Sequence, residues 1–100
     1  MASHEREQLR PRRIDQNQPA IVAALRNAGV YVFHSHTLGG GFPDIVAYNA
    51  ETNRLRLIEV KMPGEKLNAK EAWFHKTFSG FCAVVTDERE AVRLMLQGGS

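Results

Sequence analysis

Two acidic residues and a lysine lie where two expected strands would bring them together. The sequence predicts strands over residues 44–48 and 54–61, joined by a polar turn. Because successive side chains of a strand point to opposite faces, Glu59 and Lys61 share one face. A carboxylate and an ammonium group at the end of a largely apolar stripe are costly to bury unless they are paired, hydrated or bound to a metal. Packing alone therefore does not explain why the second strand ends in Glu59-Val60-Lys61.

Antiparallel pairing of these two strands would place the acidic residues opposite each other. If Asn49 lies opposite Arg54, the same register places Asp44 opposite Glu59, with their Cβ atoms about 5 Å apart. Two carboxylates at that separation repel each other, and a shared divalent cation relieves the repulsion. Mg²⁺ suits such a site because it takes oxygen ligands, often one or two carboxylates, and retains several waters. A slip of one residue would turn Asp44 to the other face, so the register is itself a prediction.

A metal held there has a chemical use, and the same residues have a simpler explanation. The metal would polarise a phosphoryl oxygen, lower the pKa of a bound water and stabilise the leaving oxygen of a phosphodiester. Lys61 could orient the attacking water or neutralise charge that builds on the phosphate. In the simpler explanation, Glu59 and Lys61 form an exposed pair of little energetic value, and Asp44 merely begins a strand after Pro43. Spacing alone leaves both explanations open.

The whole chain has the length and composition of one small soluble domain. It has 100 residues, of which 43% are hydrophobic and 24% charged, and this balance excludes wholesale disorder. No apolar run approaches the roughly 20 residues of a membrane span, and no apolar segment of a secretory signal follows the start. Cys82 is the single cysteine and cannot form an internal disulfide, which fits a reducing compartment. We therefore expect a soluble, intracellular protein.

The excess positive charge lies at the start of the chain. Residues 1–13 hold four arginines against two glutamates, a balance of +2 that equals the formal net charge of the whole chain. We expect these residues to form a flexible basic arm, which either contacts an anionic partner or is a solvated leader. A single domain is expected over residues 14–97, with residues 98–100 as a flexible tail.

Periodicity and turn residues outline the first half of this domain. Apolar residues at helical spacing between Ile21 and Ala28 predict a helix that Gly29 ends, and Asp15 or Asn17 is the candidate cap at its start. The β-branched and aromatic residues 30–33 predict a strand that runs toward His36. The two strands that carry the acidic residues follow.

The second half of the chain predicts a helix, a strand and a final helix. Asn68 is followed three residues later by Glu71, the spacing of a capping box, so a helix is expected from there to about Phe78. Residues 81–86 form a short apolar run that predicts a buried strand, and Asp87 caps the last helix. The predicted order is αβββαβα around one mixed sheet, which makes the protein an α/β domain.

A longer pattern around the acidic residues resembles a known family. The chain carries Gly41-Phe42-Pro43-Asp44 and, after fourteen further residues, Glu59-Val60-Lys61. This arrangement is similar to the signature of the PD-(D/E)XK nucleases. From about residue 15 to residue 92 the sequence resembles the virus-type replication-repair nuclease (VRR-NUC) branch, in its small stand-alone phage-like form. The resemblance implies a restriction-endonuclease-like αβββαβ core, with a mixed central sheet flanked by helices.

The resemblance also implies a function. It indicates a metal-dependent DNA endonuclease in which Asp44, Glu59 and the main-chain carbonyl of Val60 bind Mg²⁺, with Mn²⁺ as a substitute, and Lys61 serves catalysis. Stand-alone members are associated with homodimers that cut four-way DNA junctions, so the implied activity is that of a Holliday-junction-resolving nuclease in DNA repair. The implied location is the cytoplasm of a bacterial or phage-infected host cell. The alternative is a DNA-binding or assembly module with the same fold and little or no catalysis.

Two positions depart from the family pattern. Family members often have an acidic residue on the first helix that completes the metal shell, whereas Ala20 and its neighbours offer none. Gln18 and Asp15 are the candidate substitutes. Many members have glutamine on the helix after the lysine strand, where Glu71 stands here. Glu71 is then either an accessory group that binds the metal or a water, or simply the capping residue already described.

Four residues near the expected site have a DNA-binding interpretation beside a structural one. Gly40 and Gly41 either form a mobile turn or allow a DNA backbone to approach closely. Lys66 and Lys70 either form a rim that binds phosphates or lie on a solvated helix face.

The aromatic residues and histidines are interpreted in the same way. Phe74 and Phe78, four residues apart, are expected in the core, whereas Trp73 fits the core, a subunit contact or a stacking position on DNA equally well. His34 and His36 share the face of one expected strand and could contact phosphate, but their spacing does not indicate a zinc site.

Overall fold

The computed structural model describes residues 15–97 of the chain. The predicted basic arm over residues 1–13 and the predicted tail over residues 98–100 lie outside these described residues. In chain order the elements are α2 (Gln18–Asn27), β1 (Tyr31–His34), a 3₁₀ helix (His36–Leu38), β2 (Ile45–Asn49), β3 (Arg54–Val60), α3 (Ala69–Thr77), β4 (Cys82–Val85) and α4 (Glu88–Leu96). The predicted αβββαβα order is confirmed, with the 3₁₀ helix added after the first strand.

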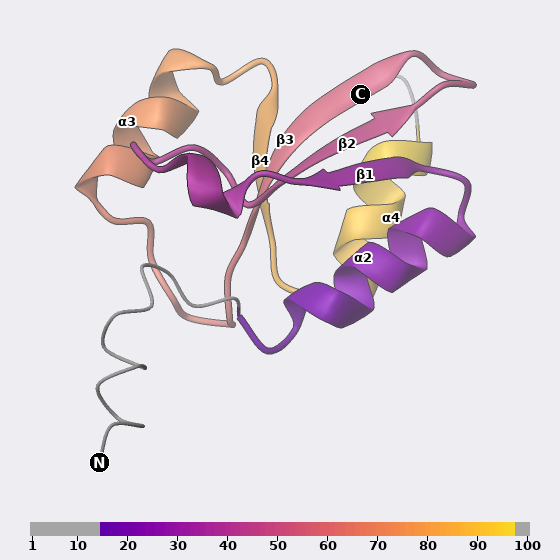
Figure 1. Cartoon of the computed structure of the whole chain (residues 1–100), viewed down its shortest axis with the longest axis horizontal. Coiled ribbons are helices and arrows are strands. Elements are labelled where there is room, and N and C mark those ends of the chain that lie inside the picture. Colours follow the sequence, from indigo (N-terminus) through magenta and orange to yellow (C-terminus); the bar gives the residue numbers. More distant parts are fainter. Residues whose placement is uncertain (1–14, 98–100) are drawn as a thin grey trace.

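A four-stranded mixed sheet in the order β1-β2-β3-β4 forms the centre of the fold (Figure 1). The pairs β1/β2 and β2/β3 are antiparallel, whereas β4 lies parallel to β3 after the crossover through α3. Asn49 lies opposite Arg54 and Val46 lies opposite Leu57, so the predicted register of β2 against β3 is confirmed. Asn53, in the turn between these strands, has a φ of 57°, a left-handed conformation that asparagine tolerates better than most residues.

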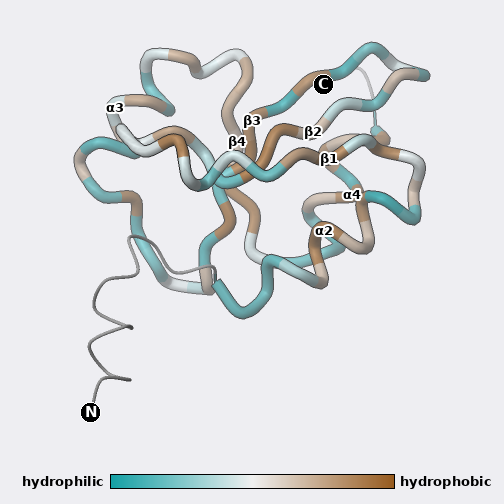
Figure 2. Tube along the Cα trace, in the orientation of Figure 1, coloured by the Kyte–Doolittle hydropathy of each residue, from teal (hydrophilic) through white to brown (hydrophobic). Residues whose placement is uncertain are grey.

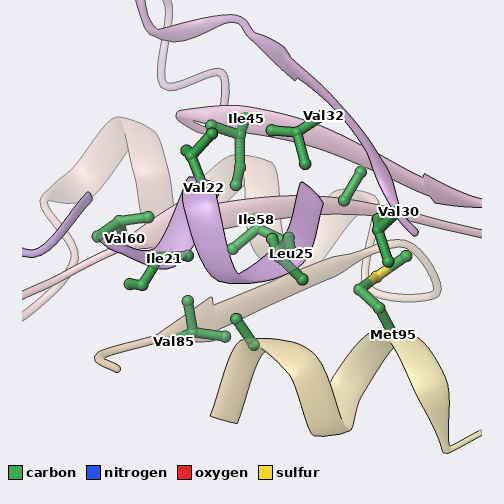
Figure 3. Close-up of a cluster of buried hydrophobic side chains, with 12 residues drawn as sticks. Ile21, Val22, Leu25, Val30, Val32, Ile45, Ile58, Val60, Val85 and Met95 are labelled. Carbon is green, nitrogen blue, oxygen red and sulfur yellow. The ribbon is translucent and has the colours of Figure 1, made fainter. Parts of the chain in front are cut away.

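α2 and α4 pack on one face of the sheet and bury the hydrophobic core (Figures 1 and 3). Ile21 and Leu25 share the inner face of α2 because they are four residues apart. Ile58 and Val60 point toward the helices from alternate positions of β3. Each such fully buried side chain stabilises the fold by about 1.5–3 kcal/mol. The complete cluster is Ile21, Val22, Leu25, Val30, Val32, Ile45, Ala47, Ile58, Val60, Val85, Ala91 and Met95.

The opposite face of β3 carries the stripe that ends in the candidate site residues. Leu55 and Leu57 alternate with the core residues and are partly exposed. Glu59 shares their face of the strand because it follows at the same period of two. Hydrophobic residues run through the strands, and the turn that joins β2 to β3 is hydrophilic (Figure 2). The apolar stripe predicted from the sequence therefore lies on the face without helices.

The helices begin at the predicted places, although one cap differs from expectation. Asn68 Oδ1 accepts a hydrogen bond from Glu71 N at 2.8 Å, and Glu71 Oε1 accepts one from Asn68 N at 2.9 Å. The predicted capping box of α3 is therefore confirmed, as is the cap of α4 by Asp87, which accepts from the backbone of Glu90. Asn17 occupies the N-cap position of α2, as one of the two predictions had it, but its side chain makes no capping hydrogen bond, because it is used in long-range contacts described below.

β1 ends earlier than the sequence predicts. The strand stops at His34, and His36 lies in the 3₁₀ helix, so the predicted shared strand face of the two histidines is wrong. The chain turns away from the sheet at Ser35, whose carbonyl accepts from Leu38 N at 3.1 Å. The Ser35 hydroxyl donates to the carbonyl of Pro43 at 2.8 Å, which fixes the end of β1 beside the start of β2.

The aromatic residues of α3 form a separate cluster outside the core. The rings of Phe74 and Phe78 lie 4.6 Å apart, and Phe42 meets Phe74 edge to face at 5.1 Å. Phe78 is 41% exposed and Trp73 is 60% exposed. The prediction that Phe74 and Phe78 belong to the core is wrong, because α3 lies beyond the end of the sheet and not on the face that α2 and α4 cover (Figure 1).

The triple-glycine turn before β2 packs against the first turn of α3. All three glycines have positive φ, with 67° at Gly40 and 86° at Gly41. A Cβ atom on Gly41 would lie 2.5 Å from the carbonyl oxygen of Lys70, whereas one on Gly40 would meet nothing within 4 Å. Only glycine therefore allows the close approach at position 41.

We expect Gly41→Ala to destabilise the protein more than Gly40→Ala does. Both substitutions force a non-glycine residue into a left-handed conformation, at a cost of about 1–2 kcal/mol. Gly41→Ala adds a clash with main-chain atoms that cannot move away as a flexible side chain would, so a total loss of roughly 3 kcal/mol or more is expected. Urea unfolding of the two variants and the parent measures this difference. Equal losses would show that the contact with Lys70 does not constrain the turn.

Candidate active site

Five carboxylates and one ammonium group line a cavity of about 200 Å³ at the end of β3. Five negative charges against one positive charge leave a formal charge of −4, so the carboxylates repel one another unless protons or cations intervene. The lining residues come from the segment before α2, the start of β2, the end of β3 and the segments after it, and the first turn of α3. They are Asp15, Asp44, Glu59, Val60, Lys61, Glu65 and Glu71.

Asp44 and Glu59 are brought together by the pairing of β2 with β3. Ile45 pairs with Ile58, so continuing the register by one residue places Asp44 opposite Glu59. Asp44 Oδ2 accepts a hydrogen bond from Val60 N at 2.8 Å, and this bond holds the carboxylate at the end of β3. Asp44 is 8% exposed and Glu59 is 2% exposed, so neither charge is well hydrated.

The environment of Glu59 strongly favours its protonated form when no cation is present. Burial raises the pKa of Glu59 to about 9, and the charges of Asp44 and Glu71 act in the same direction, only partly offset by Lys61. Glu59 Oε1 is buried without a hydrogen-bond partner. A buried carboxylate oxygen with no donor beside another carboxylate is what a bound cation would satisfy.

Lys61 lies among three carboxylates. Its Nζ atom is 2.9 Å from Glu71 Oε1, 3.8 Å from Glu59 Oε2 and 3.9 Å from Glu65 Oε2. Burial lowers the pKa of Lys61, but the hydrogen bond and charge of Glu71, together with Glu59 and Glu65, more than offset this and raise it above its ordinary value. Lys61 is therefore an ammonium group and acts as a hydrogen-bond donor.

Glu71 joins the capping box of α3 to this lysine. The same Oε1 atom that accepts from Asn68 N also contacts Lys61 Nζ. Burial raises the pKa of Glu71, but the Asn68 backbone and Lys61 outweigh it, so the pKa is lowered. Of the two roles considered for Glu71, the capping role is confirmed, and the contact with Lys61 is an additional one. Its accessory role toward a metal or a water stays a prediction.

Asn17 ties the start of α2 to the strand ends beside the cavity. Its Nδ2 donates to the carbonyl of Lys61 at 3.0 Å and to the carbonyl of Thr86 at 2.7 Å. These contacts bridge 44 and 69 positions of the sequence, which is why local sequence patterns did not reveal them. They place Asp15, two residues earlier, at the rim of the cavity.

Glu65 lines the site and His75 lies near it, and neither residue was predicted to do so. Glu65 follows the Pro63-Gly64 turn, where Met62 N donates to Glu65 Oε1 at 2.8 Å, so the turn brings this carboxylate back toward Lys61. His75 lies one turn after Glu71 on α3. Burial lowers its pKa, and the charges of Glu71, Lys61 and Asp44 also act on it. The spacing of four residues from Glu71 was the one available signal.

Several predicted accessory or DNA-binding residues do not line the cavity. Gln18 is buried in the first turn of α2, and its Nε2 has no hydrogen-bond partner among the described residues. Lys66 and Lys70 are exposed. The close backbone approach at Gly41 is to Lys70 itself. Contacts of Gly40, Gly41, Lys66 and Lys70 with DNA, and the accessory role of Gln18, stay predictions.

The donor set fits a hard divalent cation. Asp44, Glu59 and the Val60 carbonyl supply oxygen ligands only, and Mg²⁺ is commonly bound through one or two carboxylates with water and substrate phosphates as its other ligands. Between residues 15 and 97, no group of three or more His, Cys, Asp or Glu side chains is arranged to hold a metal. A cation at this site would therefore depend on water and substrate to complete its coordination.

The fold and the site together define a class of protein. A mixed sheet flanked by helices, two carboxylates facing each other across β2 and β3, and a lysine two positions after the second carboxylate are the features of a PD-(D/E)XK nuclease on a restriction-endonuclease-like α/β fold. The model of the VRR-NUC domain family matches residues 4–85. The chain belongs to this family, and the resemblance predicted from the sequence is confirmed.

A curated relative supports the same assignment. Over 54 residues the chain is 37% identical to the Fanconi-associated nuclease 1 homolog of Caenorhabditis elegans. The match covers 54% of this chain and 6% of that protein, so the chain spans only a small part of the relative's length. No solved structure matches the chain. No helix in the described part of the chain is long and apolar enough to cross a membrane.

Family membership places the chain among nuclease domains. PD-(D/E)XK nucleases generally use divalent metal ions, which agrees with the oxygen donors of Asp44 and Glu59.

We expect the metal-free protein to lose stability as the pH rises from 7 to 8.5. With its pKa raised to about 9, Glu59 keeps a proton in the folded protein that the unfolded chain, with an ordinary pKa near 4.5, has already released. The free energy of unfolding then falls with pH by at most about 1.4 kcal/mol per pH unit. Urea unfolding in EDTA measures it, and Glu59→Gln should flatten the dependence.

The contributions of the other shifted groups to a slope in this window are separated from that of Glu59 by their sign or by control variants. The pKa of His75 is lowered from 6.5, which makes stability rise with pH, and that of Lys61 is raised from 10.5, so this group stays protonated throughout the window. The pKa of Cys82 is raised from 9.0, so its contribution has the same sign as that of Glu59 toward the upper end of the window, and Cys82→Ser controls for it. Asp15, whose pKa is also raised, is controlled by Asp15→Asn. A slope that survives in Glu59→Gln would contradict the assignment to Glu59.

We also expect Glu71→Gln and Glu71→Ala to differ in stability. Glutamine keeps both capping hydrogen bonds, and losing the charge near Lys61 is offset by weaker repulsion of Glu59, so a change within about 1 kcal/mol is expected. Alanine removes the cap, at a cost of about 1–2 kcal/mol. Thermal and urea unfolding compare the two. If glutamine were as costly as alanine, the ion pair with Lys61 would outweigh the cap.

Proposed function

We propose that this domain is a divalent-metal-dependent endonuclease that cuts branched DNA as a homodimer, with the Holliday junction as its preferred substrate. The observation that carries the proposal is the convergence of Asp44, Glu59 and Lys61 in one cavity, where Val60 N fixes Asp44 against the end of β3. These residues come from two strands and are brought together only by the strand register.

Asp44, Glu59 and the carbonyl of Val60 would hold the metal, for which Mg²⁺ is proposed and Mn²⁺ is a substitute. When bound, the cation would polarise a phosphoryl oxygen and lower the pKa of a bound water. The two carboxylates would also fix the position of the cation relative to the scissile phosphate. Val60 contributes through both main-chain groups, since its N–H holds Asp44.

Lys61 would stabilise the negative charge that builds on the phosphate. Its ammonium group is held by Glu71 on one side and lies near Glu59 on the other. A lysine whose pKa is raised keeps its proton, so it donates to a phosphoryl oxygen or to the attacking water and does not serve as a general base.

The branched substrate and the homodimer follow from the needs of a small domain. One chain offers one cavity of this composition among its described residues, and a two-fold dimer would present two such cavities to the two strands that a junction resolvase nicks. The exposed Lys66 and Lys70, with Gly40 and Gly41 nearby, are proposed to contact phosphates at the rim.

A second candidate function is a DNA-binding or assembly module with weak or no catalysis. One observation favours it: no third acidic side chain among residues 15–97 is arranged with Asp44 and Glu59 to hold a metal. The presence of both carboxylates and the lysine in one cavity favours the enzyme, because DNA binding alone does not require a concentration of negative charge.

We expect metal-dependent cleavage that requires Asp44 and Lys61. A labelled four-way junction and a matched linear duplex would be incubated with the protein in Mg²⁺, Mn²⁺, Ca²⁺ or EDTA. Paired symmetric nicks on the junction are expected with Mg²⁺ and Mn²⁺ only. Asp44→Ala and Lys61→Ala should each reduce the rate by about 100-fold or more. Glu51→Ala, which changes an exposed carboxylate in the β2–β3 turn, should leave it unchanged.

Each other outcome selects a different function. Equal cutting of the junction and the duplex would keep the nuclease and remove the junction preference. Junction binding without cutting in any metal would select the binding module.

A further inference from the structure

One face of the sheet is not covered by any helix among the described residues. α2 and α4 pack on the opposite face, and α3 lies beyond the end of the sheet (Figure 1). By the strand register, this uncovered face carries two apolar residues from each strand, together with Glu59 at the end of β3. The apolar residues are Tyr31 and Phe33 of β1, Val46 and Tyr48 of β2, Leu55 and Leu57 of β3, and Cys82 and Val84 of β4.

The uncovered face is apolar and strongly exposed. Phe33 is 63% exposed, Tyr31 59%, Val84 43% and Leu55 37%. The solvent-exposed face of an antiparallel sheet usually carries polar side chains. On this face, aromatic and aliphatic side chains instead form continuous rows across the strands. Such a patch in a folded chain indicates a surface that binds another molecule.

The absence of exposed charge on the uncovered face argues against nucleic acid as its partner. None of these eight residues is basic or acidic, and the charged Arg54 and Arg56 of β3 alternate onto the other face. The one acidic residue of the uncovered face, Glu59, is buried at the end that meets the cavity. Binding of DNA or RNA needs basic side chains that neutralise phosphates, even where aromatic residues stack on bases. An uncharged apolar surface is instead complementary to another surface of the same kind.

The size of the uncovered face suits the centre of a small dimer interface. A fully exposed aromatic side chain presents roughly 150–250 Å² of surface. With their fractional exposures, the eight apolar residues of the uncovered face together expose roughly 400–500 Å². A stable interface buries about 800 Å² per partner, and in homodimers about 65% of the interface area is non-polar. The remaining area would come from a polar rim.

We propose that a second copy of this chain docks on the uncovered face through a two-fold interface, in which each subunit contributes the same patch. The inference rests on the proposed function for the existence of a homodimer and adds the surface that forms it. Because Glu59 lies on the same face, beside Val84 of the next strand, the dimer would place both active sites at the edges of the interface.

Phe33→Lys tests this proposal. Phe33 lies on the uncovered face of the edge strand β1 and is already more than half exposed, so a lysine there should not prevent folding, which far-UV circular dichroism checks. In a two-fold interface the substitution buries a charge from each subunit among apolar groups, and the dimer should dissociate about 100-fold more readily or worse. Leu55→Lys is a second variant on the same face, and Leu96→Lys on α4, where leucine is 42% exposed, is the matched control.

Sedimentation equilibrium without DNA or metal measures the mass. The parent and Leu96→Lys should have twice the 11.2 kDa of one chain, and Phe33→Lys and Leu55→Lys should have the mass of one. A monomeric parent, or a dimer that survives both lysines on the face, would overturn the proposal. Binding of a single-stranded oligonucleotide by a monomeric parent, lost in Phe33→Lys, would assign the face to nucleic acid instead.

The mass measurement separates this proposal from the proposed function. A monomeric parent that cuts DNA would overturn the docking surface and leave the nuclease. A dimer that is broken by Phe33→Lys but never cuts would do the reverse.

Discussion

The site depends on the register of β2 against β3, because this register keeps Asp44 and Glu59 opposite each other although their carboxylates repel. Ile45 pairs with Ile58 in the core, so the apolar contacts of one residue pair set the separation of the next pair, whose charges repel. The hydrogen bond from Val60 N to Asp44 then prevents the carboxylate from turning away. The sheet cannot relax this repulsion by slipping, because a slip of one residue would expose the buried face of the strand.

The negative charge around this pair is distributed over several elements. Lys61 is held by Glu71 at the start of α3, by Glu59 on its own strand and by Glu65 after the turn. Asn17 connects the start of α2 to the carbonyls that follow β3 and β4. The cavity is therefore lined by residues at or near the ends of helices and strands. These ends hold the side chains more rigidly than a long loop would. An excess of carboxylates over one ammonium group is costly in a folded protein, which explains why the site favours either a proton or a cation.

Among the described residues, the core lies on one side of the sheet, which α2 and α4 cover. Two helices are enough to cover one face, and α3 is used to carry Glu71 to the site. A chain of this length buries about two-thirds of its unfolded surface, so an apolar face remains on the other side. The active site is at the end of that same face, so the chemistry and the exposed apolar surface are close together without sharing residues.

Local patterns in the sequence determined the elements, the capping box of Asn68 and Glu71, and the register that sets Asn49 opposite Arg54, because alternation and turn residues act over a few positions. The Asp44, Glu59 and Lys61 constellation followed from that register. Tertiary structure alone decided which face the helices cover, which is why Phe78 is outside the core and Leu55 is exposed. It also decided that Asn17 bridges two strand ends and that Glu65 and His75 approach the site. These contacts join residues distant in the sequence or depend on how a turn is oriented, and short-range periodicity contains no information about either.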